Sequence, residues 1–391
     1  MRMKKLMILA VAAIALVACS KTFEPSATSE GNAIGFGTWT NVLTKTNRTP
    51  GTGTFVASDD FAVSGTKSVS SSNVDVFNNV TVTYGGTDWT YPVANKQYWD
   101  NSADSYTFYA ISPAELCTAD DPVLAMTTAG VVTTNSGKSL TFAGNDNDIL
   151  LADKVTVNKG SSAPYFLNYE KVNMQFNHAA AMLDIKVKKS SGLDNVDAKL
   201  EITGITLSDI DKTATFEVSA YSNTNYNSET NPLLYHPTLT TAWAEVTNAA
   251  KGTYTNANSV GGPATLPDDV SATGDDVITN LIVLPQTFRA SNASNTQKVT
   301  ITYKIYQKIG EDGSDDPIYG AASEYAPGAF ALTLFDETDE STDTDNNGTV
   351  TGWEPGKHYT YIITIDARAI EFTAAVTSWG TVTNAHYYLV N

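Results

Sequence analysis

The sequence predicts an all-β protein made of antiparallel β-sandwiches, and three observations lead to this prediction. Apolar and polar residues alternate with a period of two in most segments, which is the spacing of a half-buried strand. Gly, Asn, Asp and Ser interrupt these segments at short intervals, as turns do. No stretch carries a sustained apolar period of about 3.6 residues, so no long amphipathic helix is expected.

Apolar alternation marks the predicted strands in chain order. The clearest alternating segments are residues 33–43, 80–84, 89–91, 183–187, 299–305 and 359–365. The pair Gly85-Gly86 predicts a hairpin turn between the second and third of these segments.

The 391-residue length allows two domains, each with a core of its own. A long strand is expected to end in the polar run Lys189-Ser190-Ser191-Gly192. We therefore predict one domain at residues 49–190 and a second at residues 191–391.

The N-terminal residues predict export. Basic residues at positions 2, 4 and 5 precede an apolar run, residues 6–17, which is shorter than the roughly 20 residues of a membrane helix. The run ends in Leu16-Val17-Ala18-Cys19, which resembles the lipobox of bacterial lipoproteins, whose cysteine is acylated and becomes the first mature residue. We expect a signal peptide at residues 1–18 and an outer-membrane lipid anchor on Cys19. The alternative is an ordinary signal peptide with an incidental cysteine.

Charge and residue types argue against several classes of function. The formal net charge is −18, and no Lys/Arg cluster provides the basic face that nucleic acid requires. The four histidines lie far apart, and no Ser or Cys stands in a nucleophile motif. Cys117 is expected to be a packed apolar residue. From these observations together we predict that the chain is not an enzyme, does not bind nucleic acid and requires no cofactor.

One segment matches a calcium-binding pattern. Residues 343–354 follow the form D-x-D-x-N-G, five further residues and Glu. The ligand oxygens would come from Asp343, Asp345, Asn347, Thr349 and Glu354. Strands are expected on both sides of this segment, so the alternative is a solvated acidic hairpin loop. Calcium would stiffen the loop and catalyse nothing.

Several motifs, ordered along nearly the whole mature chain, resemble one known family. In the first half they are Trp89-x-Tyr91, Tyr98-Trp99, Tyr106-x-Phe108-Tyr109-Ala110-x-Ser112-Pro113, Asp148-Ile149-Leu150 and Phe176-x-His178-Ala179. In the second half they are Leu284-Pro285-Gln286, Trp353-x-Pro355-Gly356-x-x-Tyr359-x-Tyr361 and Val376-x-x-Trp379. In order and spacing they are similar to the fimbrillin family. The resemblance implies two tandem transthyretin-like β-sandwiches, in a type V pilin or in a lipoprotein that caps or anchors such pili.

The resemblance also implies a maturation pathway. Such subunits are exported as lipoproteins, and an arginine-specific protease then removes the first strand, which opens a groove that a strand of another subunit fills. In this chain the cut would fall between Arg48 and Thr49, in a connection rich in Gly, Pro and Thr. Residues 19–48 would then be a propeptide that carries the removable first strand, and the mature form would lie in extracellular fimbriae. The implied partners are other copies of this chain, related fimbrial subunits, the protease and, through the lipid, the outer membrane.

The C-terminal segment at residues 380–391 is the candidate donor strand. Ala385, Tyr387 and Leu389 fall on one of its faces. The alternative is that this segment closes the C-terminal sheet.

The favoured function is that of a structural stalk subunit that polymerises by strand exchange. A fimbrial tip or anchor lipoprotein is one alternative. Another is a monomeric surface lipoprotein that binds glycans by stacking sugars on Trp89, Trp99 and Trp243, although tryptophans in strands more often lie in the core.

Overall fold

The computed structural model describes residues 33–38, 55–144, 148–161, 166, 171–222, 235–247, 249–260, 265–289, 296–312, 316–320, 328–333, 351–366 and 370–378. Within these ranges the fold is all-β, as predicted, and most pairings are antiparallel. The helices there are α1 (Glu115–Thr118), α2 (Ser191–Asp194), η2 (Val93–Asn95) and η3 (Asn256–Asn258). None of the described helices has the length and apolar character needed to span a membrane.

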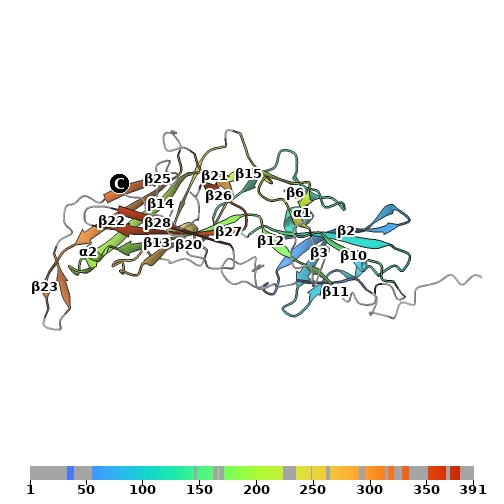
Figure 1. Ribbon diagram of the computed structural model, residues 1–391, viewed down its shortest axis with the longest axis horizontal. Coiled ribbons are helices and arrows are strands. Elements are labelled where there is room, and N and C mark those ends of the chain that lie inside the picture. The colour runs from blue at the N-terminus through green and yellow to red at the C-terminus, as the bar shows by residue number, and fades with distance from the viewer. Residues whose placement is uncertain are drawn as a thin grey trace, which may run out of the picture.

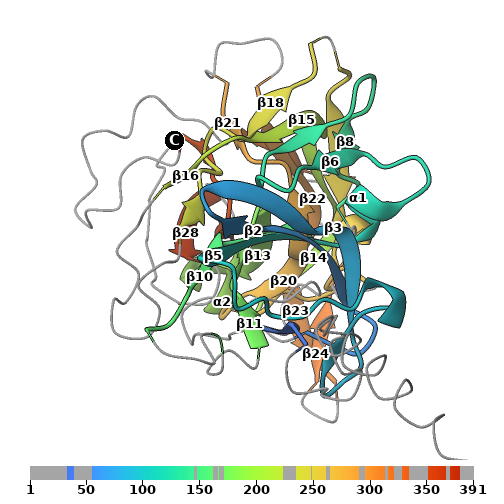
Figure 2. The same cartoon turned by 90° about the vertical axis from the view of Figure 1, so that its right-hand side faces the viewer.

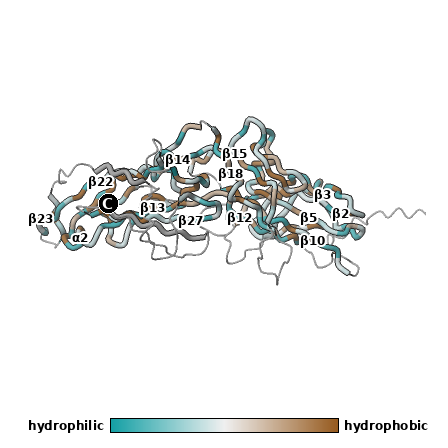
Figure 3. Tube along the Cα trace, turned by 45° about the horizontal axis from the view of Figure 1, so that its top comes forward, coloured by the Kyte–Doolittle hydropathy of each residue, from teal (hydrophilic) through white to brown (hydrophobic). Residues whose placement is uncertain are grey.

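The molecule is elongated, with β2 and β3 in one half and β23 at the opposite extremity (Figure 1). Figure 2 views it along the long axis, with β2 and β3 in front of β13, β14 and β22. Hydrophobic residues follow the strands in both halves (Figure 3). The buried side chains form three hydrophobic clusters, which the sheets enclose one after another.

A seven-stranded sheet organises the N-terminal half. Its strands, in order of pairing, are β12 (Phe176–His178), β9 (Leu150–Ala152), β5 (Ser105–Ser112), β2 (Asp60–Val69), β3 (Ser72–Tyr84) and β4 (Trp89–Thr90), with β10 (Val155–Asn158) also on β5. The predicted hairpin is confirmed, because Tyr84 pairs with Trp89 across the turn. Gly86 adopts a φ of 94°, which a residue without Cβ allows.

The first described strand, β1 (Gly35–Thr38), pairs in parallel with β11 (Lys171–Met174) in a two-stranded sheet. Their apolar side chains join those of the seven-stranded sheet in one core. The strand predicted at residues 33–43 is therefore confirmed where the structure describes it.

A second layer covers the other face of the seven-stranded sheet. It contains β18 (Trp243–Glu245), β15 (Thr213–Val218), β7 (Val132–Thr134) and β6 (Leu124–Met126), with β8 (Leu140–Thr141) on β15. A short pair, β16 (Tyr221–Ser222) and β17 (His236–Pro237), lies outside it. Because β15 pairs with both β7 and β8, this layer joins residues from both sides of the boundary at residue 190. That boundary stays a prediction.

Two four-stranded sheets form a sandwich in the C-terminal half. One contains β20 (Asp275–Val283), β13 (Ala181–Lys189), β27 (Lys357–Ile365) and β28 (Ile370–Ser378). The other contains β19 (Gly252–Thr255), β14 (Lys199–Ile210), β22 (Lys298–Tyr306) and β25 (Gly328–Thr333). The strands predicted from alternation at residues 183–187, 299–305 and 359–365 are confirmed as β13, β22 and β27.

Two small pairs complete the described strands. β21 (Gln286–Thr287) pairs with β26 (Gly352–Trp353), and β23 (Lys308–Glu311) forms a hairpin with β24 (Pro317–Tyr319). The first pair joins the Leu-Pro-Gln motif to the Trp-x-Pro-Gly motif, because Gln286 is the partner of Trp353. The Phe288 amide also donates a hydrogen bond of 2.7 Å to the Thr351 carbonyl, 63 positions further along the chain. The two motifs therefore lie side by side in the folded chain.

Cys117 is packed, as predicted. It lies in α1, is 8 % exposed, and belongs to the middle hydrophobic cluster. Burial raises the pKa of its thiol to about 12. The thiolate is the reactive form of cysteine, and a raised pKa lowers the fraction of Cys117 that is thiolate, so the reaction of Cys117 with a thiol reagent is slowed.

We therefore predict that native mature chain labels with a thiol reagent at pH 8 at least about 1,000-fold more slowly than chain unfolded in urea. A Cys117→Ser, Val74→Cys variant, whose thiol stands at a 46 % exposed position, sets the rate for an accessible cysteine. Native Cys117 reacting as fast as that variant would contradict the prediction.

Candidate functional site

The place where β1 lies is the candidate site, and we call β4, Tyr91, Gln97 and β11 the strand seat. Phe36 of β1 stands in register with Val172 of β11. At the start of the strand, the Ile34 amide donates to the Gln97 carbonyl over 2.9 Å. The Tyr91 hydroxyl donates to the Ile34 carbonyl over 2.7 Å. Contacts from both sides therefore hold β1.

The side chain of Phe36 fills the centre of the N-terminal core and is 1 % exposed. Four rings surround it edge-on, with centroid distances of 5.3 Å to Phe77, 5.8 Å to Tyr91, 6.0 Å to Phe108 and 6.1 Å to Phe61. Burying a phenylalanine contributes roughly 1.5–3 kcal/mol, and edge-on ring pairs add to this. A strand of four residues thus supplies the central ring of a core that the rest of the domain encloses.

Large side chains on one face of the first strand and a glycine on the other explain how this segment packs into the domain. Ile34 and Phe36 point into the core, where both are buried, and Gly37 is buried on the other side. A Cβ at Gly37 would lie 2.7 Å from Oδ1 of Asn173. A side chain at that position would have to displace the amide of Asn173.

Polar groups at the rim of the strand seat contribute less. Lys171 forms an ion pair of 2.9 Å with Asp88, and both side chains are more than half exposed. Exposed pairs of this kind are worth about 0–1 kcal/mol. Burial raises the pKa of Tyr91, so its hydroxyl remains protonated and continues to donate to β1.

Most residues that the sequence singled out lie outside the described part of the chain. They are Cys19, Arg48, Thr49, Asp343, Asp345, Asn347, Thr349, Ala385, Tyr387 and Leu389. Glu354 is described; it is exposed between β26 and β27, and its backbone amide donates to the Tyr359 hydroxyl over 2.9 Å. The predictions for lipidation, cleavage, calcium and strand donation therefore stay predictions.

The sequence did not reveal the partner of β1. Residues 171–174 alternate in exposure, which is a visible strand signal, but nothing in the sequence ties them to residues 35–38. The structure brings these segments together with the Trp89-x-Tyr91 motif, since Trp89 Nε1 donates to Thr38 Oγ1 over 3.3 Å.

The three tryptophans considered for glycan stacking are half-buried and packed. Trp89 lies 5.0 Å from Phe55, Trp99 stacks on Phe166 at 5.3 Å, and Trp243 lies 4.6 Å from Phe216. The indole nitrogen of Trp243 also donates to the Ala179 carbonyl over 2.6 Å. These rings serve the core, as strand tryptophans usually do.

Each histidine that the structure describes contacts an aspartate, which the sequence did not reveal. His178 contacts Asp148, His236 contacts Asp153 at 2.6 Å, and His358 contacts Asp184 at 2.7 Å. Burial raises the pKa values of Asp148 and Asp153, and their histidine partners oppose that effect. Within the described ranges no group of three or more His, Cys, Asp or Glu residues could hold a metal.

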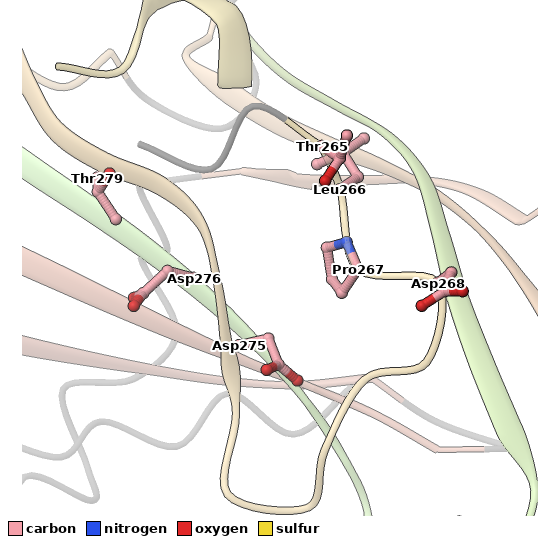
Figure 4. Close-up of a pocket in the computed structure, with 7 residues that line it drawn as sticks. All are labelled: Thr265, Leu266, Pro267, Asp268, Asp275, Asp276 and Thr279. Atoms are coloured by element: carbon pink, nitrogen blue, oxygen red, sulfur yellow. The ribbon is translucent and has the colours of Figure 1, made fainter. Parts of the chain in front are cut away.

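A pocket of about 750 Å³ lies beside the edge strand β20 (Figure 4). It is lined by residues 265–268 together with Asp275, Asp276 and Thr279. Asp276 pairs with Lys186 at 3.0 Å, and Asp275 accepts a hydrogen bond of 2.6 Å from the Ser271 amide. Both carboxylates therefore already have structural partners.

Comparison with known proteins gives one family. The family model described as Fimbrillin-like matches residues 44–379. No curated protein matches the chain. The family assignment rests on this model because it spans most of the sequence.

Several solved structures are similar at low identity. A fimbrial protein from Bacteroides vulgatus ATCC 8482 is 16 % identical, with 89 % of this chain and 99 % of that chain covered and a TM-score of 0.49. A candidate cell adhesion protein from Bacteroides uniformis ATCC 8492 is 16 % identical, with 90 % and 99 % covered and a TM-score of 0.47. The tip fimbrial protein Mfa3 from Porphyromonas gingivalis, with a C-terminal truncation, is 10 % identical, with 83 % and 95 % covered and a TM-score of 0.30.

Proposed function

The chain belongs to the fimbrillin-like family, and we propose that within this family it is a stalk subunit that polymerises by strand exchange. Membership makes it a fimbrial subunit of the cell surface, with a structural and not an enzymatic role and with other fimbrial subunits as partners. The stalk position, the exchange of strands and the maturation steps are our proposal.

The observation that carries the proposal is the burial of Phe36 in a strand that precedes Arg48 in the chain. Arg48 lies between β1 and β2, so a cut after it separates β1 from the body. Without β1, the rings around Phe36 and the edge of β11 would face water, which is costly. A strand of matching pattern from another copy would restore both the backbone pairing and the core.

Export and release follow from the same cut. We propose that acylation of Cys19 holds the precursor in the outer membrane. Cleavage after Arg48 by an arginine-specific protease then removes residues 19–48, and with them both the lipid and β1. One proteolytic event would thus free the subunit and make it able to accept a strand.

Residues 380–391 are our proposed donor strand. The apolar alternation in this segment supports the proposal, because it places Ala385, Tyr387 and Leu389 on one face of a strand. A stalk subunit needs both a seat and a donor, whereas an anchor needs neither the cut nor the tail. This requirement favours the stalk over the anchor.

The Arg48→Ala variant tests the proposed switch. Treated with an arginine-specific protease, the wild-type precursor is expected to lose residues up to 48 and to form high-mass polymers, measured by size exclusion and mass spectrometry. The variant is expected to stay uncut and monomeric. Arg289 should resist the protease, because its guanidinium pairs with Asp211 at 2.6 Å and its amide donates to Gln297 over 2.8 Å.

Cleaved wild-type chain that remains monomeric at high concentration would contradict the proposal. So would an Arg48→Ala variant that polymerises as well as the wild type. Lys45 is the control site, since a less selective protease could cut there, and Lys45→Ala should change nothing with the arginine-specific enzyme.

We also propose that the loop at residues 343–354 binds a structural calcium ion through Asp343, Asp345, Asn347, Thr349 and Glu354. Calcium is expected to raise the melting temperature of the wild type and to leave that of Asp343→Asn unchanged, because one carboxylate ligand is lost. Equal responses of the two proteins to calcium and to a chelator would contradict the site.

A further inference from the structure

The hairpin of β23 and β24 exposes apolar side chains at one extremity of the molecule (Figure 1). Ile309 is 67 % exposed and Ile318 is 44 % exposed. Val196, 59 % exposed, belongs to the same region, because the neighbouring Asp197 pairs with Lys308 of the hairpin at 2.8 Å. We call Val196, Ile309 and Ile318 the end patch.

The exposed isoleucines lie on the two strands of this hairpin. A two-stranded hairpin has little core of its own, and β-branched apolar residues on an unpaired edge invite association. Glu311 and Asp312 follow Ile309, Asp316 precedes Ile318, and Glu311 pairs with Lys308 at 2.8 Å. The end patch is thus an apolar surface with an acidic rim.

A second exposed apolar surface stands beside the strand seat. Val93 is 83 % exposed and Tyr98 is 51 % exposed. Tyr98 bridges directly to Ala33 at the start of β1, so this surface borders the place that a donated strand would occupy. Lys96 lies between them and forms no ion pair within the described ranges. We call Val93, Lys96 and Tyr98 the shoulder.

The two surfaces complement each other. Both are apolar, one has an acidic rim and the other an available lysine, and they lie in opposite halves of an elongated molecule (Figure 1). A contact between two different surfaces of identical copies is heterologous and generates an open filament instead of a closed dimer.

We propose that the end patch of one copy packs on the shoulder of the next. The occupant of the shoulder is therefore a second copy of this chain. The inference rests on the proposed function, because strand donation would bring the body of the donor next to the strand seat, where the shoulder stands. It adds a second contact, from folded surfaces, to the donated strand.

A cysteine ladder tests the contact directly. The double variant Val93→Cys, Ile309→Cys, cleaved, assembled and oxidised, is expected to give a ladder of disulfide-linked multimers on a non-reducing gel. Each single variant should give none, because its partner position lacks a thiol. The matched control is Val74→Cys, Ile309→Cys, since Val74 is exposed but lies outside the shoulder. Native Cys117 is buried and does not compete.

A second arm separates the shoulder from the strand seat. Val93→Asp is expected to slow polymer growth at least 10-fold while cleaved chain still binds a synthetic peptide of residues 380–391 with unchanged affinity. Lys96→Glu should slow growth too, and adding Asp316→Lys should restore it, because the charges are exchanged.

The outcomes distinguish the two claims. Cleaved wild type that polymerises, with no ladder from the double variant and unchanged growth in the aspartate variant, would overturn the contact alone. Cleaved wild type that neither binds the peptide nor polymerises would overturn the proposed function, and this inference with it.

Discussion

Replacing Phe36 by alanine is expected to lower the free energy of unfolding of the uncut chain by about 3–5 kcal/mol. The ring is 1 % exposed and lies within 5.3–6.1 Å of four others, so truncation leaves a cavity that these rings cannot easily close. Urea unfolding, followed by tryptophan fluorescence, measures the change.

The same substitution should have no effect once the chain is cut and its seat is filled. In the polymer the strand that carries Phe36 is gone, so wild-type and variant chains become identical. The control is Phe77→Ala, whose ring is also 1 % exposed but lies in β3 and remains after the cut. Phe77→Ala should destabilise both forms. If Phe36→Ala weakened the polymer as much as the uncut chain, β1 would not be the strand that is removed.

Deleting residues 380–391 is expected to abolish polymer growth while leaving the strand seat intact. The truncated subunit, once cut, can accept a donated strand but has none to give. Mixed with an equal amount of cleaved wild type, it should cap growing chains and shorten them to a few subunits. Negative-stain microscopy and size exclusion measure the length.

Stability separates the two interpretations of this C-terminal segment. A donor strand is dispensable for the folding of an isolated subunit, so the uncut truncated chain should unfold at the same urea concentration as the wild type. Marked destabilisation would support the alternative in which the segment closes its own sheet. Leu389→Asp compared with Val390→Asp then reveals which face enters a neighbour, because only the inward face tolerates no charge.

Local patterns predicted the strands well. The alternation in β13, β22 and β27 is long and regular, and in β27 the predicted inward residues Tyr359, Tyr361, Ile363 and Ile365 are all buried. The hairpin of β3 and β4 was equally readable, because Gly86 supplies the turn within a few residues of both strands. In each case the determining interactions lie within one strand or one turn.

Pairings between distant segments could not be predicted. β1 pairs with β11, and β15 pairs with β7. Near the second pairing, the Phe216 amide donates a hydrogen bond to the Thr134 hydroxyl, 82 positions away in the chain. A period of two shows which side of a strand is buried but not which strand lies beside it. For the same reason the histidine–aspartate contacts were not foreseen, since His358 meets an aspartate 174 positions away.

The candidate site contains both a feature that local alternation predicted and a feature that depends on distant pairing. Alternation predicted a strand at residues 33–43, which includes Ile34 and Phe36, and the structure places both of these side chains in the core. The strand seat, in contrast, is assembled from residues 89–91, Gln97 and residues 171–174, which only the folded chain brings together.

The most direct test of the central claim is the N-terminus and intact mass of the protein recovered from surface filaments. If β1 is removed by cleavage after Arg48 and replaced by a strand of another copy, the protein in high-mass polymers begins at Thr49 and carries no lipid. Protein in polymers that begins at an acylated Cys19, with Arg48 uncut and β1 retained, would contradict the account.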